Sequence, residues 1–314
     1  MKKVVIFGGG SGLSQLLKGL KLFPLELTNV VTVADNGQST GRLRKEFSIP
    51  AVGDISKVLL AMSDVDNDVR ALMNYRFTGS KTLGNHSIKN LLLTALLDLK
   101  GDFKSSIPIL ANLLDIRGHV IPLTEANVDL VGITEANEYV IGEENITKSK
   151  KKIVEITYNQ EFEVYDEVLS AVKEADLIII SSGSLYTSIL PHIVVKELAS
   201  AINQSQAEKL YICNLVTQPG ETDGFSVSDH LKVLLDKINI DYVIANNTKM
   251  DGELVNKYAT EEQKDPVEFD LDKINSLGVK AIGDRIFTIE DDMLRHDSLK
   301  TAYLIFSHLM KEDQ

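Results

Sequence analysis

Short apolar runs rich in β-branched residues alternate along the chain with longer amphipathic segments. The short runs are almost continuously apolar, which is typical of strands covered by helices on both faces. The predicted strands are residues 3–7, 29–34, 153–158, 177–181, 209–213 and 242–245. The predicted helices are residues 13–22, 55–63, 88–99, 166–175, 185–202, 226–238 and 298–310. This alternation predicts an α/β fold built on a doubly wound, mostly parallel sheet.

Two regions depart from that alternation. Residues 64–117 carry helical patterns only and predict a helical insertion. Residues 118–160 carry shorter strand-like runs separated by Thr, Glu and Asn, which predict a small antiparallel excursion. Because no repeat, low-complexity tract or long linker interrupts the sequence, we expect residues 1–314 to form a single α/β domain.

Composition and charge exclude several classes of protein. Hydrophobic residues make up 44% of the 314 residues and charged residues 25%, as in an ordered globular protein. Lys and Arg number 33 and Asp and Glu 45, so the net charge is −12 and we expect no nucleic-acid partner. The only cysteine is Cys213, which excludes an internal disulfide and fits a reducing cytoplasm. The longest aliphatic run, residues 177–180, is far shorter than the ~20 residues of a membrane-spanning helix, so we expect a cytoplasmic protein without membrane insertion.

Four glycines surround a serine directly after the first predicted strand. Residues 8–12 read Gly-Gly-Gly-Ser-Gly, and a predicted helix follows them. Glycine lets the backbone approach a ligand closely, and the free N–H groups of a helix N-terminus favour an anion. The dinucleotide fingerprint Gly-x-Gly-x-x-Gly is matched only in part, since its third glycine position holds Leu13. A tight turn without a ligand is the alternative, but so many glycines favour a phosphate-binding loop.

Charged side chains follow the second predicted strand. Asp35 stands near the position where a dinucleotide fold places its ribose-binding acid. Arg42 and Arg44 lie in the polar segment after it and are candidates for phosphate contacts or ordinary surface charges. Asp54 opens the next predicted helix, either as an N-cap or as a carboxylate that holds a metal or a hydroxyl beside Asp35.

A second strand-to-helix turn repeats this arrangement at residues 181–184. Ser184 and Thr187 place hydroxyls at the start of the next predicted helix, where capping is compatible with ligand binding. Both turns follow strands of a parallel sheet, so they emerge at the same edge, where open α/β sheets bind ligands. The sequence therefore predicts two anion-binding turns that face one cleft.

A third polar cluster and one arginine complete the candidates. Asn85, His86 and Asn90 lie around the start of a strongly apolar predicted helix, within reach of a ribose, sugar or phosphate. A structural role for His86 is favoured over catalysis. Arg295 either precedes an ordinary helix cap or returns a cation to the cleft. No histidine pair has metal-ligand spacing, so no metal site is assigned.

The strings that contain these residues are similar to those of the bacterial gluconeogenesis factors, relatives of the 2-phospho-lactate transferases of deazaflavin cofactor synthesis. The most specific strings are residues 183–191, Gly-Ser-Leu-Tyr-Thr-Ser-Ile-Leu-Pro, and residues 214–222, Asn-Leu-Val-Thr-Gln-Pro-Gly-Glu-Thr. The resemblance covers nearly the whole chain and implies a Rossmann-like three-layer α/β/α fold. It also implies a regulatory factor that binds a nucleotide sugar such as UDP-N-acetylglucosamine and is needed for cell shape and growth on gluconeogenic carbon sources, without established turnover.

The motifs and the resemblance together give one set of expected ligand-binding residues. These are Gly8, Gly9, Gly10, Ser11, Gly12, Asp35, Asn36, Thr40, Arg42, Asn85, Asn90, Gly183, Ser184, Leu185, Tyr186, Thr187, Asn214, Thr217, Tyr258 and Arg295. The candidates for catalysis are Asp35, Asp54 and His86, and no cofactor is required. We further expect a homo-oligomer, a cell-wall or metabolic protein partner, and a kinase acting at Ser298, where a helix dipole would favour the phosphate.

The chain departs from the family pattern at several positions. Asn36 and Ser56 replace a usual carboxylate and a usual arginine, and Lys89 replaces a glycine. These losses favour binding over phosphoryl-transfer chemistry, which depends on metal and cationic clamps. One alternative is a transferase that moves a phosphate-linked group from a nucleotide diphosphate, with Mg²⁺ held by Asp35 or Asp54. Another is a nicotinamide dehydrogenase.

Overall fold

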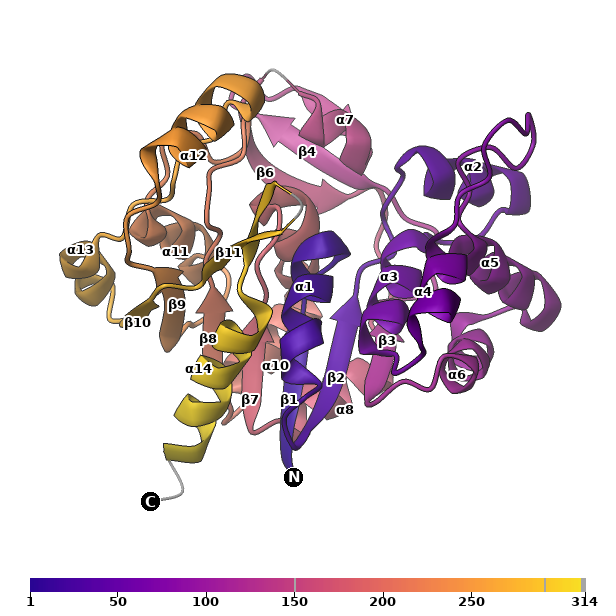
Figure 1. Ribbon diagram of the computed structural model, residues 1–314, viewed down its shortest axis with the longest axis horizontal. Helices are drawn as coiled ribbons and strands as arrows, with labels where there is room; N and C mark the ends of the chain where they lie inside the picture. Colours follow the sequence, from indigo (N-terminus) through magenta and orange to yellow (C-terminus); the bar gives the residue numbers. More distant parts are fainter. Residues whose placement is uncertain (150, 291, 312–314) are drawn as a thin grey trace.

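A seven-stranded parallel sheet forms the centre of the protein. The computed structural model describes residues 1–149, 151–290 and 292–311. The strand order is β10-β9-β8-β7-β1-β2-β3 (Figure 1). The bounds are β1 Lys2–Phe7, β2 Leu25–Val31, β3 His119–Pro122, β7 Leu177–Ile180, β8 Glu208–Ile212, β9 Tyr242–Asn246 and β10 Lys280–Asp284. Every neighbouring pair is parallel, so the predicted α/β fold is confirmed.

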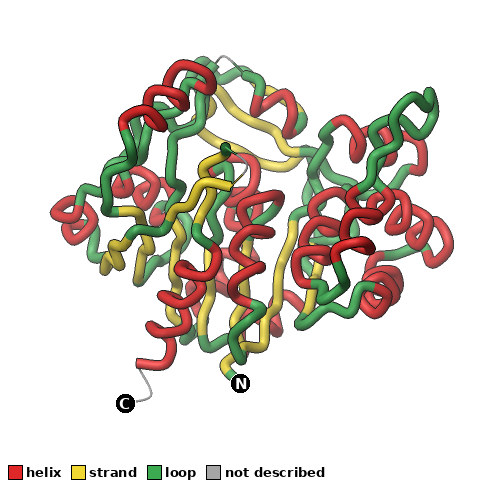
Figure 2. Tube along the Cα trace, viewed as in Figure 1, coloured by secondary structure: helices red, strands yellow, loops and turns green. Residues whose placement is uncertain are grey.

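Helices cover both faces of the sheet and produce three layers (Figure 2). Alternate strand residues point to opposite faces, so Ile6 and Ile179 join one hydrophobic cluster while Phe7 and Ile180 join the other. The helices over the first face include α1 (Gly10–Leu20), α3 (Gly53–Met62) and α14 (Ser298–Lys311). Those over the second face include α8 (Asp166–Glu174), α10 (Lys196–Gln204) and α11 (Val227–Leu235).

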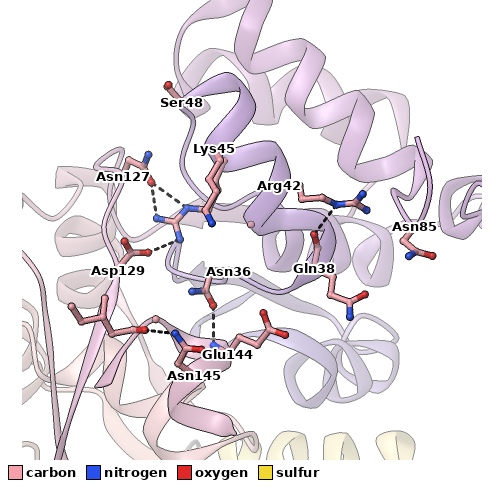
Figure 3. Close-up of a pocket in the computed structure, with 14 residues that line it drawn as sticks. Asn36, Gln38, Arg42, Lys45, Ser48, Asn85, Asn127, Asp129, Glu144 and Asn145 are labelled. Atoms are coloured by element: carbon pink, nitrogen blue, oxygen red, sulfur yellow. Dashed lines mark hydrogen bonds and ion pairs between the residues drawn. The ribbon is translucent and has the colours of Figure 1, made fainter. Parts of the chain in front are cut away.

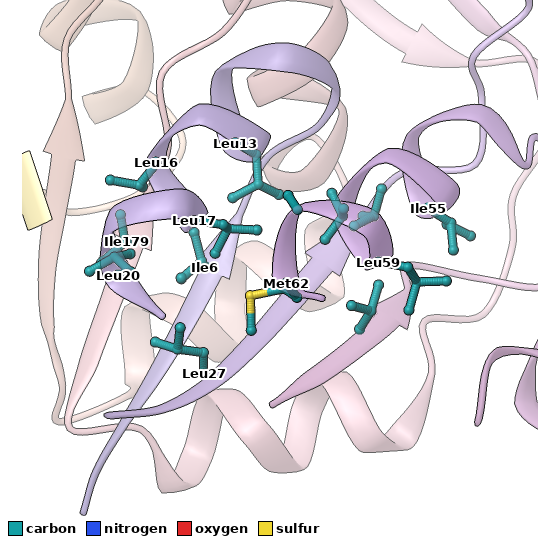
Figure 4. Packing of buried hydrophobic residues seen from close by; sticks show 14 of the residues in the cluster. Ile6, Leu13, Leu16, Leu17, Leu20, Leu27, Ile55, Leu59, Met62 and Ile179 are labelled. Atoms are coloured by element: carbon teal, nitrogen blue, oxygen red, sulfur yellow. The ribbon is translucent and has the colours of Figure 1, made fainter. Parts of the chain in front are cut away.

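An aliphatic stripe holds α1 against the sheet. Leu13, Leu17 and Leu20 recur at helical spacing, are fully buried, and lie over Ile6 (Figure 4). Burying one leucine contributes about 1.5–3 kcal/mol relative to leaving it exposed. Because α1 begins three residues after β1 ends, this packing determines where its N-terminal turn lies at the edge of the sheet.

A small antiparallel sheet lies beyond the carboxyl ends of the parallel strands, at the top of Figure 1. It contains β4 (Leu130–Thr134), β5 (Tyr139–Ile141) and β6 (Ile153–Tyr158) in the order β5-β4-β6, with α7 (Glu143–Thr147) after β5. The expectation of an antiparallel excursion over residues 118–160 is wrong at its start. Strand β3 pairs in parallel with β2 at the edge of the main sheet. This four-residue strand, which begins with histidine and ends with proline, is too short to show a clear pattern.

Residues 64–117 contain three helices beyond the β3 edge of the sheet (Figure 1). They are α4 (Asn67–Asn74), α5 (Ile88–Lys100) and α6 (Phe103–Leu113). Several other elements were not predicted because each is short or polar. They are α2 (Gln38–Phe47), α7, α12 (Gly252–Lys257) with a π-helical turn (Tyr258–Glu262), α13 (Leu271–Ser276), the edge strand β10, and the hairpin of β11 (Phe287–Glu290) and β12 (Met293–His296).

Two of the predicted elements differ in ways that have a structural reason. The helix expected over residues 185–202 is a π-helical turn (Leu185–Ile189), then α9 (Leu190–Ile193), then α10. All three pieces bury apolar side chains, so the continuous apolar pattern does not reveal the break between them. The strand expected over residues 29–34 ends at Val31, and the carbonyl of Val33 instead accepts a hydrogen bond from the N–H of Ala51 at 3.1 Å.

Candidate functional site

The two predicted turns lie against each other at the carboxyl edge of the sheet. Strands β1 and β7 are neighbours, and the chain continues from β1 toward β2 but from β7 toward β8 on the other side. Ligands in doubly wound folds bind at such a reversal of strand order. A Cβ on Gly12 would lie 2.2 Å from the carbonyl oxygen of Ser182, so only glycine allows this contact. The turns therefore form one continuous backbone surface.

Asn214, which follows β8, holds the second turn in place. Its Nδ2 donates to the carbonyl of Gly183 at 2.7 Å, and its Oδ1 accepts from the Gly183 N–H at 3.0 Å. Ser184 caps the following helical turn, because its Oγ accepts from the Thr187 N–H at 3.0 Å. The capping role considered for Ser184 is thus present, and Asn214 fixes the backbone orientation beside it.

The carboxylate of Glu221 completes this turn and was not predicted. Its Oε2 accepts a hydrogen bond from Ser184 Oγ at 2.6 Å, and Oε1 accepts one from Gln218 Nε2 at 2.7 Å. Glu221 is 2% exposed, and burial raises the pKa of its carboxyl to about 7. Glu221 belongs to one of the strings that carry the family resemblance, but no local pattern shows that it reaches back to Ser184.

The raised pKa of Glu221 makes stability depend on pH. Between the unfolded pKa of 4.5 and the folded value near 7, the folded state binds more protons, so stability falls as pH rises. Glu221→Gln cannot ionise and retains an acceptor for Ser184. The quantity of interest is the free energy of unfolding of Glu221→Gln minus that of the wild type. We expect this difference to be larger at pH 8 than at pH 5 by up to about 3 kcal/mol. Urea unfolding at both pH values measures this difference. Exposed Glu197→Gln is the control, and an equal difference at both pH values for Glu221→Gln would contradict the prediction.

Two hollows open beside the glycine turn. The glycine hollow, of about 230 Å³, is bordered by Ser11, Gly12, Gly183 and Arg295, together with Asn214. The basic hollow, of about 440 Å³, shares Ser11 and Arg295 with it. The side chain of Arg295 has no hydrogen-bond or ion-pair partner among the described residues, so its guanidinium is available to a ligand in either hollow.

Thr217 and Tyr258 also border the glycine hollow, and each hydroxyl oxygen accepts one hydrogen bond from a backbone N–H. Thr217 Oγ1 accepts from the Asp265 N–H at 2.9 Å, and the Tyr258 hydroxyl accepts from the Leu294 N–H at 2.5 Å. Tyr258 is only 5% exposed. Both side chains therefore shape the wall of the hollow.

Two further hollows continue the site toward β2. The aspartate hollow, of about 330 Å³, is bordered by Asp35 and Thr40 and shares Lys57 and Lys89 with the basic hollow. The amide hollow, of about 900 Å³, shares Asn85 with the aspartate hollow. Each of the four hollows thus shares lining residues with the next, and the series is called the crevice.

Carboxylates gather between the glycine turn and the aspartate hollow. Asp54 lies in the first turn of α3 without capping it, and a Cβ on Gly9 would lie 2.7 Å from its Oδ2. Burial raises the pKa of Asp54, while Lys57 forms an ion pair with it at 2.9 Å. Asp35 accepts from the hydroxyl of Thr40 at 3.1 Å. The two candidate aspartates therefore lie at one site.

Glu143 of α7 adds a third carboxyl group that was not predicted. Burial first, and the charges of Asp35 and Asp54 next, raise its pKa to about 9. Glu143 lies in α7, which follows β5 of the small antiparallel sheet and is far from Asp35 and Asp54 in the sequence. Within the described residues, no group of three or more Asp, Glu, His or Cys side chains is arranged to hold a metal ion on its own. Asp35 and Asp54 do offer the carboxylate oxygens that Mg²⁺ prefers when phosphates supply further ligands.

The amide hollow lies at the far end of the crevice (Figure 3). Asn36 is fixed there, because its Oδ1 accepts from the Glu144 N–H at 2.8 Å. Arg42 is exposed and donates from Nε to the carbonyl of Gln38 at 3.2 Å. Arg44 is not a surface charge: it is 7% exposed and its Nη1 lies 2.9 Å from Asp129 Oδ1.

Several predicted residues lie behind or outside the crevice. Leu185 is fully buried in the core, and Tyr186 borders a separate hollow of about 410 Å³ beside α11. His86 is 3% exposed, its Nδ1 lies 3.0 Å from Ser39 Oγ, and burial lowers its pKa. Asn90 borders the aspartate hollow while accepting a hydrogen bond from Ser56 Oγ at 2.6 Å. The expectation that Leu185 and Tyr186 face the ligand cleft is therefore corrected.

Comparison with known proteins agrees with this architecture. The family model described as 2-phospho-L-lactate transferase CofD matches residues 4–287. A protein of Halalkalibacterium halodurans called gluconeogenesis factor is 42% identical over 97% of this chain and 95% of its own length. The gluconeogenesis factor of Bacillus subtilis is 41% identical over 99% of this chain and 98% of its own length. The chain belongs to the gluconeogenesis factor branch of the CofD family.

The family fold is also known from crystal structures. Two structures of a Bacillus halodurans protein each superimpose with a TM-score of 0.94, at 42% and 41% identity, over 97% of this chain and 99% of theirs. The resemblance inferred from the sequence motifs is thus confirmed. Among the described residues of this family member, no helix is long and apolar enough to cross a membrane.

Proposed function

We propose that this protein is a cytoplasmic, nucleotide-sugar-binding regulatory factor that takes a ligand resembling UDP-N-acetylglucosamine. The observation that carries the proposal is the contact between the two turns at residues 8–12 and 182–184, at the reversal of strand order. Backbone N–H groups of such turns, with the N-terminus of α1, favour a diphosphate. The cation of Arg295 is available at the same place.

The length of the crevice supports a ligand larger than a phosphate. The glycine hollow adjoins the basic hollow on one side of Ser11, and the series continues to the amide hollow. A nucleotide sugar has a diphosphate between two bulkier groups. The proposed pose places the diphosphate on the glycine turn, one flanking group in the glycine hollow and the other toward the aspartate hollow, which leaves the basic hollow free.

The names of the relatives support a role in gluconeogenic growth. Two bacterial relatives that match nearly the full chain carry the name gluconeogenesis factor. The proposal therefore includes a requirement during growth on gluconeogenic carbon sources, with an effect on cell shape through a cell-wall or metabolic partner. Ser298 is partly exposed at the start of α14, and its phosphorylation stays a prediction that mass spectrometry of the native protein checks.

Isothermal titration calorimetry with UDP-N-acetylglucosamine tests ligand binding directly. We expect a Kd in the micromolar range, roughly −8 kcal/mol. N-Acetylglucosamine and UMP are the controls, and each should bind at least tenfold more weakly because neither carries a diphosphate. An absence of heat together with an unchanged melting temperature at millimolar UDP-N-acetylglucosamine would refute the proposal.

A transferase is the second candidate, favoured by the proximity of Asp35 and Asp54 to the glycine turn. In this alternative the two carboxylates would hold Mg²⁺ against the ligand diphosphate, where the ion would neutralise phosphate charge. Titration of UDP-N-acetylglucosamine in Mg²⁺ and in EDTA separates the two candidates. Binding that is unchanged by EDTA and by Asp54→Asn would count against the Mg²⁺ site.

A further inference from the structure

The basic hollow has the opposite charge to the protein as a whole. The chain carries a net charge of −12, but this hollow contains five cations and one carboxylate. The cations are Lys18, Lys57, Arg70, Lys89 and Arg295, and the carboxylate is Glu290. They come from α1, α3, α4, α5 and the β11–β12 hairpin, so the charge does not result from a local basic run.

Three of these cations have no carboxylate partner among the described residues. Arg70 donates to the backbone carbonyls of Leu60 at 2.8 Å and Ser63 at 3.1 Å. The guanidinium of Arg295 has no hydrogen-bond or ion-pair partner among the described residues. Within the same residues, the only hydrogen bond of Lys89 Nζ is to the amide oxygen of Asn74. By contrast, Lys57 is paired with Asp54 and Lys18 lies 4.0 Å from Glu290.

Among the cations of the basic hollow, Lys89 gives the strongest indication that an anion binds in it. It is 6% exposed, and a buried cation without a counterion is unfavourable because it loses hydration. Burial first, then Arg76 and Lys57, lower its pKa to about 8. Lys89 also borders the aspartate hollow, where Asp35 is the carboxylate, and the other charged groups near it are those of the basic hollow. An anion between Lys89, Arg70 and Arg295 would relieve this unfavourable arrangement.

We propose that the basic hollow is a second binding site, for a compact small molecule with at least two negative charges such as a sugar phosphate. Its volume of about 440 Å³ suits a molecule of that class. Ser11 lies on the wall shared with the glycine hollow, so the polyanion occupies the space beside the nucleotide sugar. The two hollows share Ser11 and Arg295, but Lys89 and Arg70 border the basic hollow and not the glycine hollow, so substitution of Lys89 tests the second site separately from the nucleotide-sugar proposal.

Calorimetry with inorganic pyrophosphate as the probe tests this site. We expect Lys89→Met, which retains the length of the side chain without its charge, to weaken pyrophosphate binding at least tenfold. Lys196→Met is the matched control, because Lys196 is exposed on α10 over the other face of the sheet. Its Kd for pyrophosphate should equal that of the wild type.

Proton uptake gives a readout that a purely structural lysine would not produce. An anion favours the protonated form of Lys89, so at pH 8 the wild type should take up a fraction of a proton on binding sulfate, which has no proton of its own to release at this pH. The uptake is obtained by comparing binding heats in HEPES and in Tris, and Lys89→Met should abolish it. The wild-type measurement stands even where the variant fails to fold.

Three results would overturn the second site: no pyrophosphate binding by the wild type at about 10 mM pyrophosphate, equal Kd values for Lys89→Met and the wild type, or sulfate binding without proton uptake. Failure of UDP-N-acetylglucosamine to bind while pyrophosphate binds through Lys89 would remove the nucleotide-sugar proposal alone. The reverse pair of results would remove the second site alone.

Discussion

Gly12→Ala should destabilise the protein and abolish nucleotide-sugar binding. The added Cβ would lie 2.2 Å from the Ser182 carbonyl oxygen, and both groups belong to backbone segments fixed by the sheet and by α1. Relief of the contact requires the two turns to separate. Overpacking of this kind typically costs 1–3 kcal/mol, and a backbone collision belongs at or above the upper end, so we expect a loss of about 3 kcal/mol. Urea unfolding and UDP-N-acetylglucosamine calorimetry measure the two effects.

Gly252→Ala is the matched control for this substitution. Gly252 begins α12, and a Cβ at this position would meet no atom within 4 Å. Alanine has the higher helix propensity, so this variant should be equal to the wild type or more stable by up to about 1 kcal/mol. Its Kd for UDP-N-acetylglucosamine should be unchanged. A Gly12→Ala protein as stable as the wild type, with unchanged binding, would show that the turns are not held in contact.

The glycine turns could be predicted because all their determinants are local. Residues 8–12 and 183–184 each lie between a buried strand and a helical segment, and parallel strands bring such turns to one edge. The other side chains of the site could not be predicted from local sequence patterns. Glu143, Lys57 and Arg70 come from different elements, and their proximity depends on how α7, α3 and α4 pack.

The motif also does not predict in which direction each of its side chains points. Ser184, Leu185 and Tyr186 are consecutive in one specific string, but Ser184 is the N-cap of the π-helical turn that begins at Leu185, and their side chains point in different directions. Ser184 therefore borders the glycine hollow, whereas Leu185 enters the core and Tyr186 faces a different hollow. A motif match transfers to neighbouring residues only where the local backbone places them on the same face.

Asn214→Asp should weaken nucleotide-sugar binding with little change in shape. The amide both donates to and accepts from Gly183, whereas a carboxylate only accepts, so the 2.7 Å contact with the Gly183 carbonyl becomes repulsive. A lost hydrogen bond of this kind costs about 1–3 kcal/mol. The substitution also places a negative charge beside the proposed diphosphate site. We expect a Kd for UDP-N-acetylglucosamine at least tenfold higher at pH 8, measured by calorimetry.

The pH dependence and a matched asparagine separate this effect from general damage. A protonated aspartic acid can donate to the Gly183 carbonyl as the amide does, so the binding defect should shrink as pH falls toward about 4, the ordinary pKa of an aspartic acid. Asn203 makes the same pair of contacts elsewhere, donating to the Lys237 carbonyl at 3.2 Å and accepting from the Asn239 N–H at 2.8 Å. Asn203→Asp should bind UDP-N-acetylglucosamine as the wild type does. An equal loss of binding in both variants, or a defect in Asn214→Asp that does not change with pH, would mean that Asn214 does not orient the second turn for the ligand.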